Sequence, residues 1–449
     1  MVNTVQCKSG KSRKMFKIGC GEKVLEVPRF AELYGYGPFC GRRSAGTADP
    51  LYCRVVIFDD GKKQNVLVIT DTCITCDRYA RELRADLAEI CRLDPSGIAF
   101  AATHTHSAPL LSTAGSIGCG EAHPEFQKIF YRTVREAAAA ALADREEISS
   151  ADSGIVELKS KLGSNRVTVE ENNTDPFIRF ARFYRPDGSV KLLMHNHGMH
   201  GIAFNGKALW NLVSADWMGA VNSLLVEKGL CTTPVYLQGA GGNINTASSC
   251  ASAENDDEHK RIAAAYAAEL EAGFRYARPL ALDTLKCQIS TVEFPVVEQS
   301  AAELRADAAK LRTMKNPYWW KNADRLDEMA VLLDRGINLR SYHDLQYFRI
   351  GDLGIFFIPG ELYIEPGLEL YERSGSAFTF ISAVSNGDGE YIFTPENADR
   401  FTDILPPEKG GIFGYYEIYD YMSKHRFKYQ SNIAGFIIKN ALKLEEMCK

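Results

Sequence analysis

Two histidines that follow an apolar segment are the residues of this sequence best suited to chemistry. His104 and His106 stand two positions apart, directly after the apolar residues 96–102. The apolar run predicts a short buried strand that ends in a loop, and because side chains alternate along a strand, both imidazoles would leave on the same side. Two neutral imidazoles directed into one cavity are suitable ligands for Zn²⁺. A pair of hydrogen-bonded core histidines would fit the same short pattern.

A second group of histidines, His195, His197 and His200, also follows a predicted strand. Three histidines so close together cannot all be ordinary core residues, because each buried ring needs hydrogen-bond partners. We therefore expect at least one of the three to bind a metal or a substrate, and we expect His197 to contact the substrate.

A glycine-rich turn follows the next predicted strand and contains Gly241, Gly242, Asn243 and Asn245. A turn of this composition can simply reverse the chain, but its backbone N–H groups can also come close to a ligand oxygen. We expect Gly241, Gly242 and Asn243 to contact the substrate. The turn lacks the lysine of a phosphate-binding loop, so phosphate binding is not favoured.

Two more polar positions follow apolar strands later in the chain. Glu361 comes after a Pro-Gly bend, where it could bind a ligand or cap the next helix, and Tyr391 ends the polar segment 385–391. All these clusters lie at predicted strand ends, which is where open α/β sheets build their sites.

Strands and helices alternate along the chain and so favour a mixed α/β architecture. The strands are predicted at 53–58, 65–70, 96–102, 153–158, 177–184, 190–195, 234–238, 346–349, 354–359 and 378–384. Helices are predicted at 78–92, from Pro124 onward, and at 214–228, 257–276, 300–314, 323–335 and 433–444.

Composition narrows the range of functions. The chain has 449 residues, 45% of them hydrophobic and 24% charged, and a net charge of -5, which gives no reason to expect nucleic acid. No apolar stretch approaches the length of a membrane span, and the polar, basic N-terminus lacks the apolar region of a secretory signal. We therefore expect a cytoplasmic protein whose partner is a small-molecule substrate, and the chain leaves room for a homo-oligomer.

The twelve cysteines are scattered except for Cys73 and Cys76, and we interpret them as free thiols. The Cys73–Cys76 pair could be redox-active or half of a metal site. We interpret it as incidental, because a structural zinc site needs a second ligand pair that the sequence does not offer.

Taken in order, the motifs resemble the catalytic domain of the neutral/alkaline ceramidase family over nearly the whole chain. The resemblance rests on Thr-His-Thr-His-Ser at 103–107, His200-Gly201, Ser-Ala-Asp at 214–216, Gly360-Glu361 and Tyr391. It implies an α/β fold with a mixed β-sheet core flanked by helices. We expect a single ceramidase-like domain over residues 1–449, with a charged helical insertion at about 298–340.

The resemblance also implies a ligand set for one zinc ion. The two histidine ligands would be His104 and His200, with His197 as the alternative to His200, and the other ligands would be Glu361 and Tyr391. A site of two histidines and a carboxylate with an open position also suits zinc hydrolysis independently of the resemblance.

Further catalytic roles follow from the same resemblance. His106 would line the site and either hydrogen-bond the substrate, transfer a proton or support the metal. Arg166 resembles the arginine of an Asn-Arg pair that reaches the family's active site, where it would hold a hydroxyl or carboxylate, although it could also be a surface arginine. Asn245 could donate its amide to a developing oxyanion.

The sequence departs from the family in two respects. Where ceramidases resemble Gly-Asp-Val-Ser-Pro, this chain has Gly-Asn-Ile-Asn-Thr, so that Asn245 replaces the serine. The sequence ends about where the family's catalytic domain should end, so we do not expect the family's carboxyl-terminal immunoglobulin-like domain. We therefore expect zinc-dependent hydrolysis of an amide or related acyl bond in a small polar molecule rather than in a membrane sphingolipid.

Three alternatives remain at this point. The zinc could serve isomerisation, elimination or glycosidic cleavage of a sugar or polyol. The chain could instead be a non-catalytic binding protein with a degenerate site. An amidohydrolase barrel with a His-x-His motif fits less well, because the charged segment after Ser300 and the late Glu361 and Tyr391 do not match regular strand–helix units.

Overall fold

The computed structural model of the chain describes residues 16–36, 39–113, 119–247, 256–313, 318–387, 389–401 and 429–449. The strands are β1 (Phe16–Val24), β2 (Gly46–Thr47), β3 (Tyr52–Asp59), β4 (Gln64–Thr70), β5 (Ile98–Ala102), β6 (Glu146–Ile148), β7 (Ser150–Glu157), β8 (Gly163–Asn165), β9 (Phe177–Tyr184), β10 (Val190–His197), β11 (Leu212–Val213), β12 (Thr233–Gln238), β13 (Ile244–Thr246), β14 (Arg278–Pro279), β15 (Leu285–Phe294), β16 (Ser341–Ile350), β17 (Leu353–Phe357), β18 (Glu361–Leu362), β19 (Phe378–Ser382) and β20 (Tyr391–Ile392).

The helices are α1 (Asp77–Cys91), α2 (Pro124–Ala143), α3 (Asp216–Glu227), α4 (Glu258–Gly273), α5 (Ala301–Arg312), α6 (Tyr318–Asp334), α7 (Ile364–Arg373), α8 (Pro395–Phe401) and α10 (Ile433–Met447). Two short 3₁₀ helices, η1 (Pro95–Gly97) and η3 (Phe274–Tyr276), complete the set.

The first sheet has the order β5-β4-β3-β1-β6, with β4 and β5 parallel and the other neighbours antiparallel. Strands β3, β4 and β5 are buried on both faces, and successive side chains along them pack into two different apolar cores. Val66 and Val68 of β4 pack toward α1 and α2, whereas Leu67 and Ile69 pack toward the other sheets. This division follows the two-residue repeat of a strand, and it explains why residues 66–69 of β4 are all apolar.

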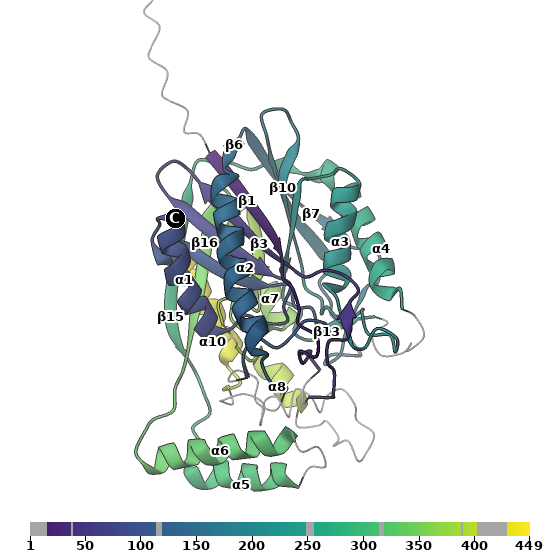
Figure 1. Ribbon diagram of the computed structural model, residues 1–449. Coiled ribbons are helices and arrows are strands. Elements are labelled where there is room, and N and C mark those ends of the chain that lie inside the picture. The colour runs from purple at the N-terminus through teal and green to yellow at the C-terminus, as the bar shows by residue number, and fades with distance from the viewer. Residues whose placement is uncertain are drawn as a thin grey trace, which may run out of the picture.

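Two more sheets share that inner core. Their orders are β12-β10-β9-β7-β14 and β15-β16-β17-β19, and one cluster of buried residues joins all three sheets, with Leu67, Leu237 and Ile355 among its members. Helices cover the outer faces, α1 and α2 on the first sheet and α3 and α4 on the second (Figure 1). The result is a mixed β-sheet core flanked by helices, which confirms the predicted fold class.

Helices α5 and α6 form a hairpin between β15 and β16 that lies apart from the sheets (Figure 1). The hairpin has a small apolar core of its own, which includes Leu304 and Leu326. Helix α5 begins at a capping box in which Ser300 and Glu303 each bond the other's backbone N–H. The helices are those predicted near 298–340, and the division of the chain into domains stays a prediction.

The parallel strands bring their carboxyl ends to one end of the molecule. Strands β4 and β5, β10 and β12, and β17 and β19 are parallel pairs, and the polar clusters of the sequence follow five of these six strands. Among the described residues, no helix combines the length and apolar character that crossing a membrane would require.

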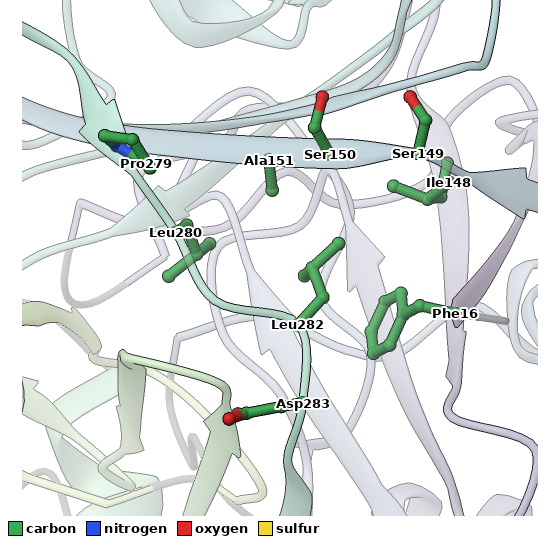
Figure 2. Close-up of a pocket in the computed structure, with 9 residues that line it drawn as sticks. All are labelled: Phe16, Ile148, Ser149, Ser150, Ala151, Pro279, Leu280, Leu282 and Asp283. Atoms are coloured by element: carbon green, nitrogen blue, oxygen red, sulfur yellow. The ribbon is translucent and has the colours of Figure 1, made fainter. Parts of the chain in front are cut away.

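The other end of the sheets holds a hollow of about 640 Å³ (Figure 2). It lies where β1 and β7 begin and is lined mainly by apolar side chains, among them Phe16, Leu280 and Leu282, with Asp283 at its margin. None of the predicted site residues lines it. The hollow therefore belongs to a different part of the fold from the polar clusters.

Candidate metal centre

His104 lies just beyond β5, in a backbone conformation that few residues adopt. The strand ends at Ala102, and His104 has a φ of 70°, in the left-handed region. The prediction that regular strand alternation aims both histidines is therefore wrong, because the chain has already left the strand. His104 is instead fixed by the β4 end, since its N–H donates to Thr72 O at 3.0 Å and its Nδ1 lies 2.6 Å from Cys73 O.

His106 reaches the same place through loop contacts. Its N–H donates to Gly201 O at 3.0 Å, and its carbonyl accepts from Arg42 Nη1 at 2.5 Å. The Arg42 guanidinium is fully buried and stacks between the rings of Tyr36 and Trp210. These contacts place His106 Nε2 3.4 Å from His104 Nε2, so the two histidines do meet.

His200 is aimed by the glycine-rich turn. Its Nδ1 lies 2.8 Å from Gly241 O and 3.1 Å from Ile244 O, and its side chain is fully buried. A carbonyl oxygen only accepts, so Nδ1 must carry the proton and the lone pair must be on Nε2. The turn thus positions a candidate ligand, a role that the sequence analysis did not predict for it.

Asp216 anchors the loop that follows His200. Its carboxylate accepts from the N–H groups of Ala203 at 3.2 Å, Phe204 at 2.9 Å and Trp217 at 2.6 Å. Burial raises the pKa of this carboxyl from 3.8 to about 6 despite these bonds. Trp217 adds a bond from its indole N–H to His200 O at 2.9 Å, so the start of α3 holds His200 in place.

Glu361 enters from the third sheet. The bend before it contains Gly360 with a φ of 94°, and β18 pairs in parallel with β20 so that Glu361 lies opposite Tyr391. Gly242 packs against this strand, because a Cβ at Gly242 would come within 2.6 Å of Glu361 O. Position 242 therefore needs glycine because the turn and the strand that carries Glu361 lie too close together for a side chain.

Three atoms that can bind a metal converge where these segments meet. Glu361 Oε2 lies 3.4 Å from His104 Nε2 and 3.2 Å from His200 Nε2, and ligand atoms of the three residues lie within 4.8 Å of one another. His104 Nδ1 faces a carbonyl as His200 Nδ1 does, so the neutral form of each ring has its lone pair on Nε2, directed at the carboxylate. Within the described part of the chain, His200 Nε2 and Glu361 Oε2 have no hydrogen-bond partner.

Such a cluster needs a positive charge at its centre. One proton shared between His104 and Glu361 would leave the lone pair of His200 unsatisfied. A divalent cation would satisfy all three atoms. Ligand atoms about 2.0–2.1 Å from a tetrahedral zinc ion stand about 3.3 Å apart, close to the separations of 3.4 and 3.2 Å seen here.

The electrostatics of the cluster agree with this donor set. Burial acts to raise the pKa of Glu361, but His104 and His200 outweigh it and hold that pKa well below the usual value. Burial lowers the pKa of His200 to about 4 and that of His106 well below 6.5. The carboxylate is therefore ionised and these two imidazoles are neutral, which are the forms that bind metals. Burial acts to lower the pKa of His104, but Cys73 and Glu361 outweigh it and raise that pKa well above 6.5, so without a metal the positive charge of the cluster is a proton on His104.

A row of polar side chains continues from Glu361. Arg166 donates from Nη2 to Tyr391 Oη at 2.9 Å and from Nη1 to Asn245 Oδ1 at 3.2 Å. It also donates to Gly242 O at 2.8 Å. Arg166 is therefore a partly buried residue beside the candidate centre and not a surface arginine, and Tyr391, Arg166 and Asn245 form one connected group.

The remaining predicted residues lie in structural networks. His197 Nδ1 is 3.1 Å from Phe177 O, and Asn243 bonds the Ile364 N–H at 2.9 Å and Glu365 at 2.9 Å, at the start of α7. His195 is bonded by Asn222 at 2.9 Å. These are the surroundings of satisfied core residues, and substrate contacts by His197, Asn243 and the two glycines stay predictions.

Cys73 is the neighbour of the centre that the sequence analysis missed. Its Sγ lies 3.7 Å from His104 Nδ1, and Cys73, His104 and His106 offer ligand atoms within 4.8 Å of one another. Cys73 therefore lies beside the candidate centre, whereas Cys76 belongs to neither group of metal-binding residues, and the interpretation of the pair as incidental stays a prediction. The position of Cys73 directly after β4, the parallel neighbour of the strand before His104, was the available signal.

The arrangement of the whole chain is similar to that of a solved neutral ceramidase from Pseudomonas aeruginosa, with a TM-score of 0.74 at 15% sequence identity; the match covers 96% of this chain and 75% of that chain. A ceramidase complexed with C2 gives a TM-score of 0.71 at 15% identity, with the same coverage of 96% and 75%. No protein-family model matches the sequence, and the search of curated proteins found no similar sequence. The structural matches confirm the ceramidase-like fold that the sequence motifs led us to expect.

Proposed function

We propose that this protein is a zinc-dependent hydrolase that cleaves an amide or a related acyl bond in a small polar substrate. The observation that carries the proposal is the convergence of His104 Nε2, His200 Nε2 and Glu361 Oε2, three atoms of metal-binding type within 4.8 Å of one another. The fold supports the reaction class, because the solved proteins that share it are named ceramidases, and a ceramidase cleaves an amide.

Zinc is the metal that this donor set fits best. Two imidazoles and a carboxylate with a further open position are typical of catalytic zinc sites. We propose Tyr391 as an additional ligand, because it lies opposite Glu361 in the pairing of β18 and β20. When bound here, zinc would supply Lewis acidity toward an acyl carbonyl and toward a water molecule.

The protein's own side chains would orient the substrate around this centre. His106, at 3.4 Å from His104, is placed to hydrogen-bond the substrate or to exchange a proton with it. Arg166 presents a guanidinium beside Tyr391 and Asn245, where it could hold a hydroxyl or a carboxylate of the substrate. Asn245 would donate its amide N–H to the oxygen on which charge develops.

The proposal also concerns the chemical class of the substrate. Asn245 stands where the ceramidase motif has a serine, so a mechanism that needs this hydroxyl is not available to the chain. The group formed by Arg166, Tyr391 and Asn245 is polar and suits a small polar acyl compound. We propose a cytoplasmic substrate of this kind rather than a membrane sphingolipid.

A panel of N-acyl amino acids and other small amides tests the reaction class through release of the amine. We expect amine release that is lost on chelation and restored by zinc. Glu361→Gln should be inactive at every zinc concentration, whereas Glu365→Gln, a matched change at a glutamate that bonds Asn243, should keep the metal. Stoichiometric zinc without any amine release, together with a keto-sugar or unsaturated product from a sugar panel, would refute the amidase assignment.

A further inference from the structure

Two groups of metal-binding atoms overlap at the candidate centre and share one residue. The first is His104, His200 and Glu361, and the second is Cys73, His104 and His106; within each group the ligand atoms lie within 4.8 Å of one another. The first offers two nitrogens and a carboxylate oxygen. The second offers a sulfur and two nitrogens, which is a distinctly softer set of donors.

Cys73 is held firmly beside His104. Its side chain is 3% exposed, its Sγ lies 3.7 Å from His104 Nδ1, and its carbonyl oxygen lies 2.6 Å from the same nitrogen. The thiol and the imidazole approach each other because β4 and β5 are parallel neighbours that end at the same edge. His106 completes the group, with its Nε2 3.4 Å from His104 Nε2 and the ligand atoms of all three residues within 4.8 Å of one another.

We propose that Cys73, His104 and His106 form a second metal position, selective for soft cations, that competes with the first. This inference rests on the proposed zinc site. On binding, the Cys73 thiol releases its proton to solvent and forms one metal–sulfur bond. The proton on His104 Nδ1 moves to Nε2, so that Nδ1 and a nitrogen of His106 bind the ion; no oxidation or reduction takes place.

The two positions exclude each other because they share His104. A neutral imidazole has one lone pair for a metal, on either Nδ1 or Nε2, so His104 holds an ion in one position or in the other, but not in both at once. A soft ion such as Cd²⁺ gains a sulfur ligand in the second position, whereas Zn²⁺ in the first keeps Glu361. Binding in the second position withdraws His104 from Glu361 and so displaces the ion of the first position.

Cadmium titration of the metal-free protein tests this inference directly. The thiolate-to-cadmium charge-transfer band in the ultraviolet reports a sulfur ligand, and zinc content after dialysis reports the first position. We expect the band in the unmodified protein and in Cys76→Ser, a matched control at a buried thiol that belongs to neither group. Cys73→Ser should lose the band and still bind one zinc ion, which also shows that the variant folds.

Glu361→Gln separates this inference from the proposed function. We expect this variant to lose zinc and keep the cadmium band, since only the first position uses Glu361. A band of equal strength in Cys73→Ser would overturn the second position while leaving the zinc site intact. Loss of zinc by Cys73→Ser would also overturn it, because Cys73 would then belong to the first position. A protein that binds neither ion would refute the proposed function itself.

Discussion

Asp216 should make the stability of this protein fall as pH rises through the mildly acidic range. Its carboxyl ionises near pH 3.8 when exposed and near pH 6 in the folded protein, because burial raises the pKa. Between these values the unfolded chain releases this proton and the folded protein keeps it. At this group the folded state therefore binds more protons, and the contribution of Asp216 to stability falls with rising pH.

The size of the effect follows from the two pKa values. The gap between 3.8 and about 6, at about 1.4 kcal/mol per pH unit, amounts to roughly 3 kcal/mol for a fully buried group. With an unfolding entropy of about 2 cal/mol/K per residue, this corresponds to a change of about 3 °C in Tm for 449 residues.

Asp216→Asn is the change that isolates this contribution. Asn keeps an acceptor oxygen and tolerates the φ of 55° at this position, but it does not titrate. We expect to measure the free energy of unfolding of both proteins with denaturant from pH 4 to pH 7.5. Over this range it should change by roughly 2–3 kcal/mol less favourably in the unmodified protein than in Asp216→Asn. Asp187→Asn, at an exposed turn where Ser189 lowers the pKa, should shift the difference slightly the other way.

Parallel stability curves for the unmodified protein and Asp216→Asn would refute this reasoning. So would a shift of the opposite sign, since it would mean that the buried carboxylate is stabilised by the N–H groups of Ala203, Phe204 and Trp217 more than burial disfavours it.

Three further changes test the site. Glu361→Gln should lower zinc affinity more than about 100-fold, measured by isothermal titration calorimetry, because it removes the charged ligand; unchanged affinity would exclude Glu361 from the centre. Asn245→Ala should keep one zinc per chain and lower kcat by at most about 100-fold, so a loss as complete as that of the ligand variants would show that its role is misassigned. Arg42→Lys should cost roughly 2–4 kcal/mol in chemical unfolding, because lysine cannot reach both His106 O and Trp210 O from one buried position; a cost below 1 kcal/mol would mean that these bonds contribute little.

The strands and helices could be predicted from the sequence wherever their apolar residues recur with a strong periodicity. Every predicted strand and helix is present, with ends that differ by a few residues. Two long strands escaped prediction. In β1, Gly19 and Gly21 obscure the strand pattern, and the structure shows that a Cβ at either would collide with the backbone of α2. The sequence of β15 is largely polar because most of its side chains are partly or fully exposed.

The residues of the candidate site could be chosen from the sequence, but the way in which they are positioned could not. His104, His200 and Glu361 could be chosen from strand ends and motif order, since parallel strands deliver their carboxyl ends to one edge. The left-handed backbone at His104, the carbonyls that turn His200 and the approach of Cys73 depend on contacts between segments far apart in the chain. Such contacts leave no mark in local periodicity.

The most direct test of the central claim is anomalous scattering at the zinc edge from crystals of the protein prepared without added chelator. We predict one strong peak about 2.0–2.1 Å from His104 Nε2, His200 Nε2 and Glu361 Oε2. A well-ordered centre with no peak, or a peak bonded to other residues, would contradict the account.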